Sequence, residues 1–176
     1  MRLPVRFTPL ALLTAVCACV PQPVAPPAPP APAPVRPQPT PAAVPTSSDW
    51  RDWPRTPGTW TYRRGAGGSL ALFGPAGGDA LLTLRCDRAG RQIILSRAGS
   101  VPGPLTIRTT STTRTLAPRP TGATPPSVAT ALAANDSLLD AMGFSRGHFV
   151  VQQAGAPTLV VPAWAEIERV TEDCRG

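Results

Sequence analysis

One serine and one histidine lie close together in a pattern that can carry nucleophilic chemistry. Residues 143–147 read G-F-S-R-G, which fits the motif G-x-S-x-G, and His148 follows directly. In enzymes that use this motif a strand enters a sharp turn and a helix leaves it, so that the serine is exposed and a histidine base activates it. A small hydrolase acting through Ser145 is therefore one hypothesis for this chain.

The elements expected around Ser145 run in the opposite order. Asn135 or Asp136 can cap a short helix over residues 137–142, and an apolar strand begins at His148. A helix therefore enters the turn and a strand leaves it, and the chain has no second histidine to act as base. We expect the two glycines to be turn residues and the protein not to be an enzyme.

Other catalytic or metal-binding patterns are weak. Residues 166–173 contain four carboxylates, which could include an acid pair for glycoside hydrolysis, but so many acids on one helix are typical of a solvated face. With one histidine and no C-x-x-C motif, the sequence gives no support for a metal site. Neither a phosphate-binding loop nor a cofactor fingerprint is present. We expect no metal and no cofactor.

The N-terminus has the composition of an export signal. Arg2 and Arg6 precede an apolar run over residues 7–16, which is interrupted by Thr8, Pro9 and Thr14. This run is too short to cross a bilayer core, which takes about 20 apolar residues. A basic start followed by a short apolar segment and small residues predicts a secretory signal peptide.

Residues 16–19 read V-C-A-C and resemble the lipobox of bacterial lipoproteins. The resemblance implies cleavage after Ala18 and acyl chains on Cys19, which hold a protein stably in a membrane. If Cys17 were modified instead, Val16 would stand where the lipobox prefers a small side chain. Residue 20 is Val, not the Asp that retains enteric lipoproteins in the inner membrane. We therefore expect a lipid anchor in the outer membrane, with the domain facing the periplasm.

A proline-rich segment separates this anchor from the rest of the chain. Residues 21–46 hold twelve prolines and one charge, Arg36. Because proline fixes φ and lacks an N–H donor, the sequence predicts a disordered, extended linker that could span about 80 Å. Its P-x-x-P spacing also fits peptide ligands of aromatic grooves. The predicted organisation is a signal peptide (1–18), the lipidated cysteine and linker (19–46), and a single domain (47–176).

Two cysteines remain in the exported part, Cys86 and Cys174, and an even pair in an oxidising compartment predicts a disulfide. Alternation places Cys86 on the same strand face as Leu82 and Leu84. A predicted C-terminal helix, which we expect to start at Pro162, has one apolar face. That face is formed by Trp164, Ile167, Thr171 and Cys174. Both cysteines are thus expected to point into the core.

The charge is basic and carried by arginine alone. All seventeen basic residues are Arg, and from Cys19 onward fifteen of them face ten acidic residues. Outside the cytoplasm this balance favours anionic neighbours such as lipid headgroups or lipopolysaccharide phosphates. No basic helix or aromatic RNA-binding motif is present, so we expect no nucleic-acid partner.

Aromatic and basic side chains supply the candidate ligand-binding residues. Trp50, Trp53, Trp60 and Tyr62 lie within thirteen residues and could stack on sugar rings of peptidoglycan or a glycolipid; the alternative is that they cover the edge of the core. Five strand arginines could form one basic sheet face, or simply be solvated. These arginines are Arg63, Arg85, Arg97, Arg108 and Arg114, of which we take Arg85 and Arg108 as ligand-binding candidates.

The remaining pattern predicts an α+β domain built on a hairpin-rich, sandwich-like antiparallel sheet with a short helix and a C-terminal amphipathic helix. Alternation with turn residues predicts one hairpin over residues 80–97 and another over 148–161. Residues 105–116 are rich in β-branched residues, with a bulge or turn at 110–112. Residues 128–133 favour a strand.

The segment from Phe149 to Cys174 loosely resembles the end of secreted invasion-associated locus B-type proteins. That resemblance implies a small, disulfide-bearing, β-rich envelope protein, and it carries over no functional residue. The expected function is a non-catalytic envelope lipoprotein that binds peptidoglycan, lipopolysaccharide or an envelope protein, or has a structural role. Besides the Ser145 hydrolase, an accessory subunit of an export machine, tethered by the proline arm, is an alternative.

Overall fold

Segments in which apolar and polar residues alternate become the strands of a six-stranded antiparallel sheet, sheet A. The computed structural model describes residues 47–176, and in it the strand order of sheet A is β1-β2-β3-β4-β8-β7. The strands of sheet A are β1 (Thr59–Gly65), β2 (Gly68–Gly74), β3 (Leu82–Asp87), β4 (Gln92–Ala98), β7 (Arg119–Pro120) and β8 (Ser127–Ala133). Each pair of neighbours is antiparallel.

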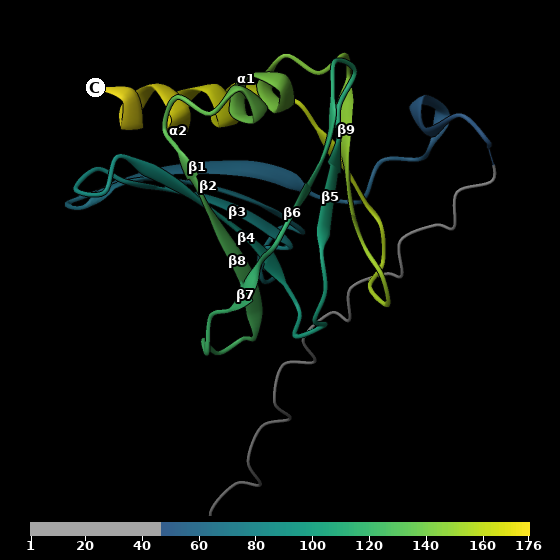
Figure 1. Ribbon diagram of the computed structural model, residues 1–176, viewed down its shortest axis with the longest axis horizontal. Coiled ribbons are helices and arrows are strands. Elements are labelled where there is room, and N and C mark those ends of the chain that lie inside the picture. The colour runs from purple at the N-terminus through teal and green to yellow at the C-terminus, as the bar shows by residue number, and fades with distance from the viewer. Residues whose placement is uncertain (1–46) are drawn as a thin grey trace, which may run out of the picture. The chain divides into compact units, whose positions relative to one another are not determined.

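A second sheet, sheet B, stands beside the first (Figure 1). Its strand order is β10-β9-β5-β6, again antiparallel throughout. The strands of sheet B are β5 (Leu105–Arg108), β6 (Thr113–Leu116), β9 (His148–Gln153) and β10 (Leu159–Pro162). The polar run between β5 and β6 is a tight turn, because Thr109 and Thr112 hydrogen-bond to each other through their main chains at 2.8 Å.

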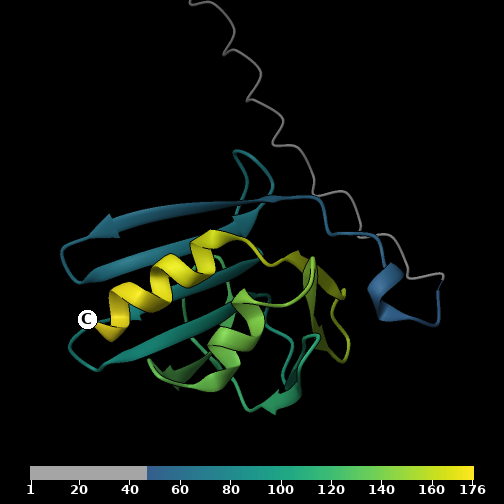
Figure 2. The ribbon, with the colours of Figure 1, turned by 90° about the horizontal axis from the view of Figure 1, so that it is seen from above.

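Helices cover one face of sheet A. The chain contains η1 (Trp50–Asp52), a 3-10 turn, α1 (Ser137–Gly143) and α2 (Ala165–Arg175). Helix α2 lies across strands β1 to β4, and α1 packs beside it (Figures 1 and 2). Asp136 caps α1, since its carboxylate accepts the main-chain N–H of Leu138 at 2.9 Å.

The core lies where sheet A, sheet B and the two helices meet. Alternation along each strand sends every second side chain inward, and these residues are buried. The largest fully buried side chains are Phe73, Phe149, Leu82, Leu84, Ile93, Leu95, Leu105, Ile107, Leu138, Leu139, Met142 and Ile167. Each side chain of this kind stabilises the fold by about 1.5–3 kcal/mol relative to an exposed one.

The predicted fold class is confirmed: the domain is α+β, with hairpin-rich antiparallel sheets, a short helix and a C-terminal helix. The break at residues 110–112 is the turn between β5 and β6, and residues 128–133 belong to β8. The predicted signal peptide, Cys19 and the linker fall within residues 1–46, outside the described part of the chain.

Two details of the C-terminal helix were predicted wrongly. Pro162 does not start the helix but ends β10, and α2 begins at Ala165. Trp164 has an extended backbone, φ −106° and ψ 165°, and precedes the first helical residue. It therefore falls outside the helical periodicity and is 42% exposed, whereas the predicted Ile167, Thr171 and Cys174 are buried as expected.

Candidate functional site

The predicted disulfide between Cys86 and Cys174 is present. Cys86 points inward from β3 and Cys174 closes the buried face of α2, with exposed fractions of 1% and 4%. The bridge therefore ties the last turn of the chain to the middle of sheet A. This is the only covalent cross-link among the described residues, and it joins positions 88 residues apart.

The first two candidate aromatic residues lie on the outer side of sheet B. Trp50 is 8% exposed and packs with Val150 and Val160, and its ring meets the His148 ring edge-on at 5.5 Å. Trp53 packs against the same cluster and donates its indole N–H to the Ser47 carbonyl at 2.7 Å. Both rings cover apolar strand residues.

Trp60 and Tyr62 share the inner side of β1, where Trp60 belongs to the main core and Tyr62 reaches α2. Trp60 is 5% exposed, lies 5.5 Å from the ring of Phe73, and donates its indole N–H to the Pro162 carbonyl at 2.8 Å. Tyr62 donates its hydroxyl to Asp173 in α2, and this bond is the main reason that the pKa of Asp173 is lowered. The four aromatic side chains are thus not gathered on one exposed face.

The five strand arginines do not form a single basic face, which was one of the two possibilities that the sequence left open. Arg97 alternates with Ile93 and Leu95 and points into the core, where it is 2% exposed. Arg114 pairs with Asp136. Arg108 lies on the outer side of sheet B, so it is separated from Arg63 and Arg85, which share the outer side of sheet A.

The outer side of sheet A carries a trough along β2, and this trough is the candidate site. Strand register places Arg63 of β1 and Arg85 of β3 on either side of Leu70. In the next row Leu72 lies between two threonines, Thr61 and Thr83. Two guanidinium groups therefore flank an aliphatic floor, which suits a ligand with both anionic and apolar parts.

Both ends of the trough are hollowed. A depression of about 260 Å³ is lined by Arg63, Arg85, Leu70 and the turn at residues 65–68. A second, of about 420 Å³, is lined by Arg63, Leu72 and the loop at residues 74–80. Arg63 borders both depressions. Arg85 was a ligand-binding candidate from the sequence and Arg63 was named for a possible basic face, whereas Leu70 and Leu72 were not recognised. Alternation alone places all four outward.

Ser145 and His148 do not form a nucleophile and base pair. The Ser145 side chain is 5% exposed; its hydroxyl donates to the His148 carbonyl at 2.6 Å and accepts the Thr110 N–H at 3.2 Å. The His148 ring instead bonds to the Trp50 carbonyl at 3.2 Å. The hydroxyl is therefore fully used in holding the turn before β9 against the β5–β6 turn.

The two glycines of the motif also have structural causes. A side chain at Gly143 would overlap the carboxylate of Glu168, which approaches from α2. Gly147 adopts a φ of +79°, a left-handed conformation that favours glycine. The pattern G-x-S-x-G thus arises here from close helix packing and a tight turn.

Two charged side chains, the buried Arg97 and the half-buried Glu168, lack full hydrogen bonding. Arg97 donates to the carbonyls of Val151 and Pro157, its Nε has no partner, and burial lowers its pKa. Glu168 buries one unpaired carboxylate oxygen, Oε1, and this burial, with repulsion from Asp140, raises its pKa. Arg97 thereby joins the two sheets, whereas the Glu168 carboxylate only packs against Gly143 of α1.

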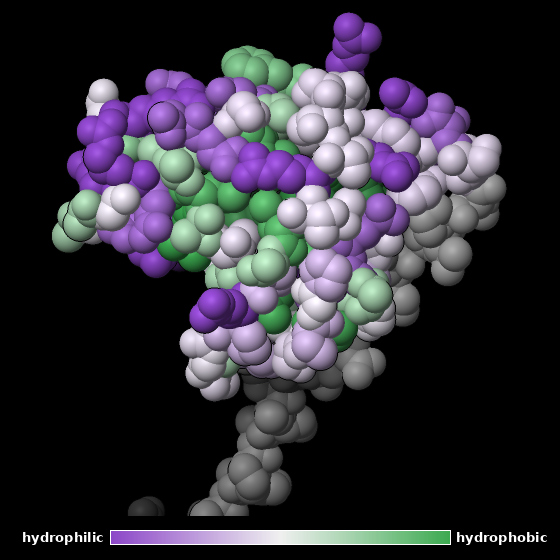
Figure 3. All heavy atoms as spheres, in the orientation of Figure 1, coloured by the Kyte–Doolittle hydropathy of each residue, from purple (hydrophilic) through white to green (hydrophobic). Residues whose placement is uncertain are grey.

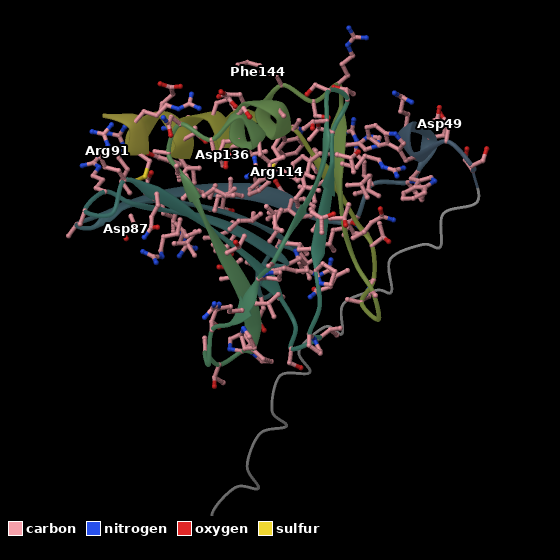
Figure 4. The ribbon with its side chains drawn as sticks, viewed as in Figure 1. Asp49, Asp87, Arg91, Arg114, Asp136 and Phe144 are labelled. Carbon is pink, nitrogen blue, oxygen red and sulfur yellow. A yellow bond between two sulfur atoms is a disulfide. The ribbon has the colours of Figure 1, made fainter. Side chains whose placement is uncertain are left out.

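Phe144 and Trp164 are the exposed large hydrophobic residues of the described chain, at 73% and 42%. Phe144 follows the last residue of α1 (Figure 4), and Trp164 precedes α2. Both lie just outside a helix, where helical periodicity gives no information about burial.

Residues 47–176 contain neither a cluster of metal ligands nor a helix that could span a membrane. No group of three or more His, Cys, Asp or Glu side chains is placed to hold a metal ion. In the same residues no helix has the length and apolar character needed to cross a membrane.

Comparison with family models, with curated proteins and with solved structures finds no match to this chain. The resemblance to the lipobox and to the invasion-associated locus B-type proteins therefore stays a prediction from the sequence.

Proposed function

We propose that the chain is a non-catalytic lipoprotein of the cell envelope, anchored in the outer membrane through Cys19, whose domain binds an envelope component from the periplasmic side. The observation that carries the proposal is the Cys86–Cys174 disulfide. Disulfides persist in oxidising compartments outside the cytoplasm, which agrees with the export signal and lipobox of the sequence.

A binding role is favoured over catalysis by the state of the candidate nucleophile. The Ser145 hydroxyl is buried and engaged by two main-chain groups, and the imidazole of His148 is bound elsewhere. By contrast, the outer side of sheet A offers two guanidinium groups that form no ion pair among residues 47–176, beside exposed aliphatic carbon. Such a surface can recognise lipopolysaccharide, another anionic lipid or an anionic polymer without performing a reaction.

A pull-down tests this proposal. The purified lipoprotein is incubated separately with sacculi and with immobilised lipopolysaccharide, and crosslinking in cells is used to capture protein partners. We expect retention on one of these envelope components or a specific crosslink. Retention on none of them, together with an absence of crosslinked partners, would contradict a binding role.

The same assay with the linker removed tests the alternative that the chain is an accessory subunit of an export machine, tethered by the proline segment. If the proline segment acts as a working arm, deletion of residues 21–46 abolishes function and leaves the melting temperature of the domain unchanged. We expect the deletion to leave binding by the domain intact.

A further inference from the structure

The outer side of sheet A is left uncovered by the described elements. Helix α2 lies across the inner face, and nothing comparable covers the outer one (Figures 1 and 2). Every outward-facing residue of β1 to β4 and of β8 is half-buried or exposed. These residues include Leu70, Leu72, Ile94, Ala129 and Ala131. Aliphatic carbon is therefore in contact with solvent over several adjacent strands.

Charge is distributed unequally between the two sides of sheet A. On the inner side the helices carry five carboxylates and two arginines, and the strands add Arg64 and the buried Arg97. On the outer side the strands carry Arg63, Arg85 and Arg119, against the single strand carboxylate Asp87 at the end of β3. Asp87 already accepts hydrogen bonds from Gln92 and from the Gly90 N–H. The molecule is thus electrostatically polar across the sheet, with its positive side outward.

The turn between β3 and β4 lies on the other side, next to the C-terminal end of α2. Arg88 and Arg91 are exposed there and border the last residues of α2 (Figure 4), and Arg88 approaches the Asp173 carbonyl at 3.4 Å. On the outer side, Arg63 and Arg85 both line the first depression, whereas Asp79 lines only the second. The end of the trough that holds both arginines is therefore the place where we expect an anionic group to bind.

We propose that the outer side of sheet A docks on the surface of an anionic phospholipid bilayer. In this arrangement Arg63 and Arg85 contact lipid phosphates, and Leu70 and Leu72 enter the boundary between headgroups and acyl chains. Guanidinium groups pair well with phosphate, and shallow insertion of aliphatic side chains adds apolar burial. The inference rests on the proposed function, because a lipid anchor keeps the domain within reach of such a surface.

Flotation with lipid vesicles tests the docking face without the anchor. The exported chain carrying Cys19→Ala, purified with its disulfide intact, is mixed with vesicles of phosphatidylethanolamine and phosphatidylglycerol, or of phosphatidylcholine alone. We expect it to float with the anionic vesicles only. Raising the salt from about 0.1 M to about 0.5 M should release it, because the Debye length then falls well below 10 Å.

Paired substitutions locate the surface. Arg63→Gln with Arg85→Gln should weaken partitioning about thirtyfold, since each arginine near an anionic surface contributes about a fivefold change. Leu70→Thr with Leu72→Thr should also weaken binding while keeping residues that favour strands. The matched control is Arg108→Gln with Arg146→Gln, which lowers the net charge equally at positions away from sheet A and should leave binding unchanged.

Several outcomes would overturn the proposal. These are equal flotation with phosphatidylcholine, no flotation with anionic vesicles, and an equal loss in the Arg108 and Arg146 control. Binding to sacculi or to a protein without vesicle binding would do the same, because it assigns the surface to a different class of partner. None of these results changes whether Cys19 is acylated, so failure of the docking face is distinguishable from failure of the anchor.

Discussion

Arg114 and Asp136 join the two sheets through a bidentate ion pair. Both terminal nitrogens of Arg114, on β6, donate to the two carboxylate oxygens of Asp136 at 2.6 Å (Figure 4). Asp136 follows β8 of sheet A and caps α1 with the same carboxylate. Figure 3 shows hydrophilic residues lying across a hydrophobic area below α1. Figure 4, in the same orientation, labels Arg114 and Asp136 in this region.

Replacing Asp136 should separate its two roles. Asp136→Asn keeps a capping oxygen but loses the charged pair, and we expect the free energy of unfolding to fall by about 1 kcal/mol. Asp136→Ala also removes the cap, so the loss should reach about 2 kcal/mol. Urea unfolding measures both values. No loss for Asp136→Asn would show that the ion pair contributes nothing, and equal losses for the two variants would show the same of the cap.

The same carboxylate should make stability sensitive to acid. Hydrogen bonding by Arg114 lowers the pKa of folded Asp136 below its value in the unfolded chain. Its contribution is therefore complete above about pH 4 and is lost as the pH falls through the lowered folded value. Unfolding between pH 2 and pH 6 should show a smaller acid loss for Asp136→Asn than for the unmodified protein. Parallel pH curves would contradict this assignment.

Glu168 should have the opposite effect. Burial raises the pKa of Glu168 in the folded protein. The contribution of Glu168 to stability is therefore greatest below its unfolded pKa, which is about 4.3, and declines as the pH rises through its folded pKa. Glu168→Gln should therefore stabilise the protein at pH 7, by up to about 1 kcal/mol because the side chain is only partly buried. The control is Glu166→Gln, which removes the same charge on α2 and should change little. A loss of stability in Glu168→Gln would contradict this prediction.

The disulfide should account for much of the domain's stability. Closing a loop between cysteines 88 residues apart restricts the unfolded chain, which corresponds to about 4 to 5 kcal/mol in the chain-entropy model. Reductant should lower the melting temperature of the unmodified protein and leave that of Cys86→Ala with Cys174→Ala unaffected. Free thiols at both positions in protein recovered from the envelope would refute a structural bridge in cells.

Ser145 should behave as a structural residue. Ser145→Ala leaves the Thr110 N–H without its acceptor and removes the donor to the His148 carbonyl, so we expect a loss of about 1 to 3 kcal/mol in unfolding free energy. A fluorophosphonate probe should not label the folded protein. Labelling of the unmodified protein but not of Ser145→Ala would instead restore the hydrolase hypothesis.

Local pattern was enough to predict most elements and the cross-link. Alternation along β3 placed Cys86 with Leu82 and Leu84, and helical spacing placed Cys174 with Ile167. Each cysteine therefore points to the core within its own element. The pairing was predictable because Cys86 and Cys174 are the two cysteines that follow Cys19 in the sequence. The cap at Asp136 was predictable for the same reason, because capping depends only on adjacent residues.

Contacts between distant segments were not predictable in this way. The pairing of Arg114 with Asp136 depends on how sheet B is placed against sheet A, which no short window of sequence records. Arg97 alternates with the inward-facing residues Ile93 and Leu95, so the strand pattern places it in the core. Its charge suggested a surface position instead. The trough became visible only when the register aligned Arg63, Leu70 and Arg85 across three strands.

Metabolic labelling with palmitate tests the central claim most directly. Cells expressing the unmodified protein or Cys19→Ala are labelled, and the protein is recovered by immunoprecipitation. The account predicts label on the unmodified protein in the outer-membrane fraction and none on Cys19→Ala. Undiminished labelling of Cys19→Ala, or an unmodified protein that is freely soluble and unacylated, would contradict it.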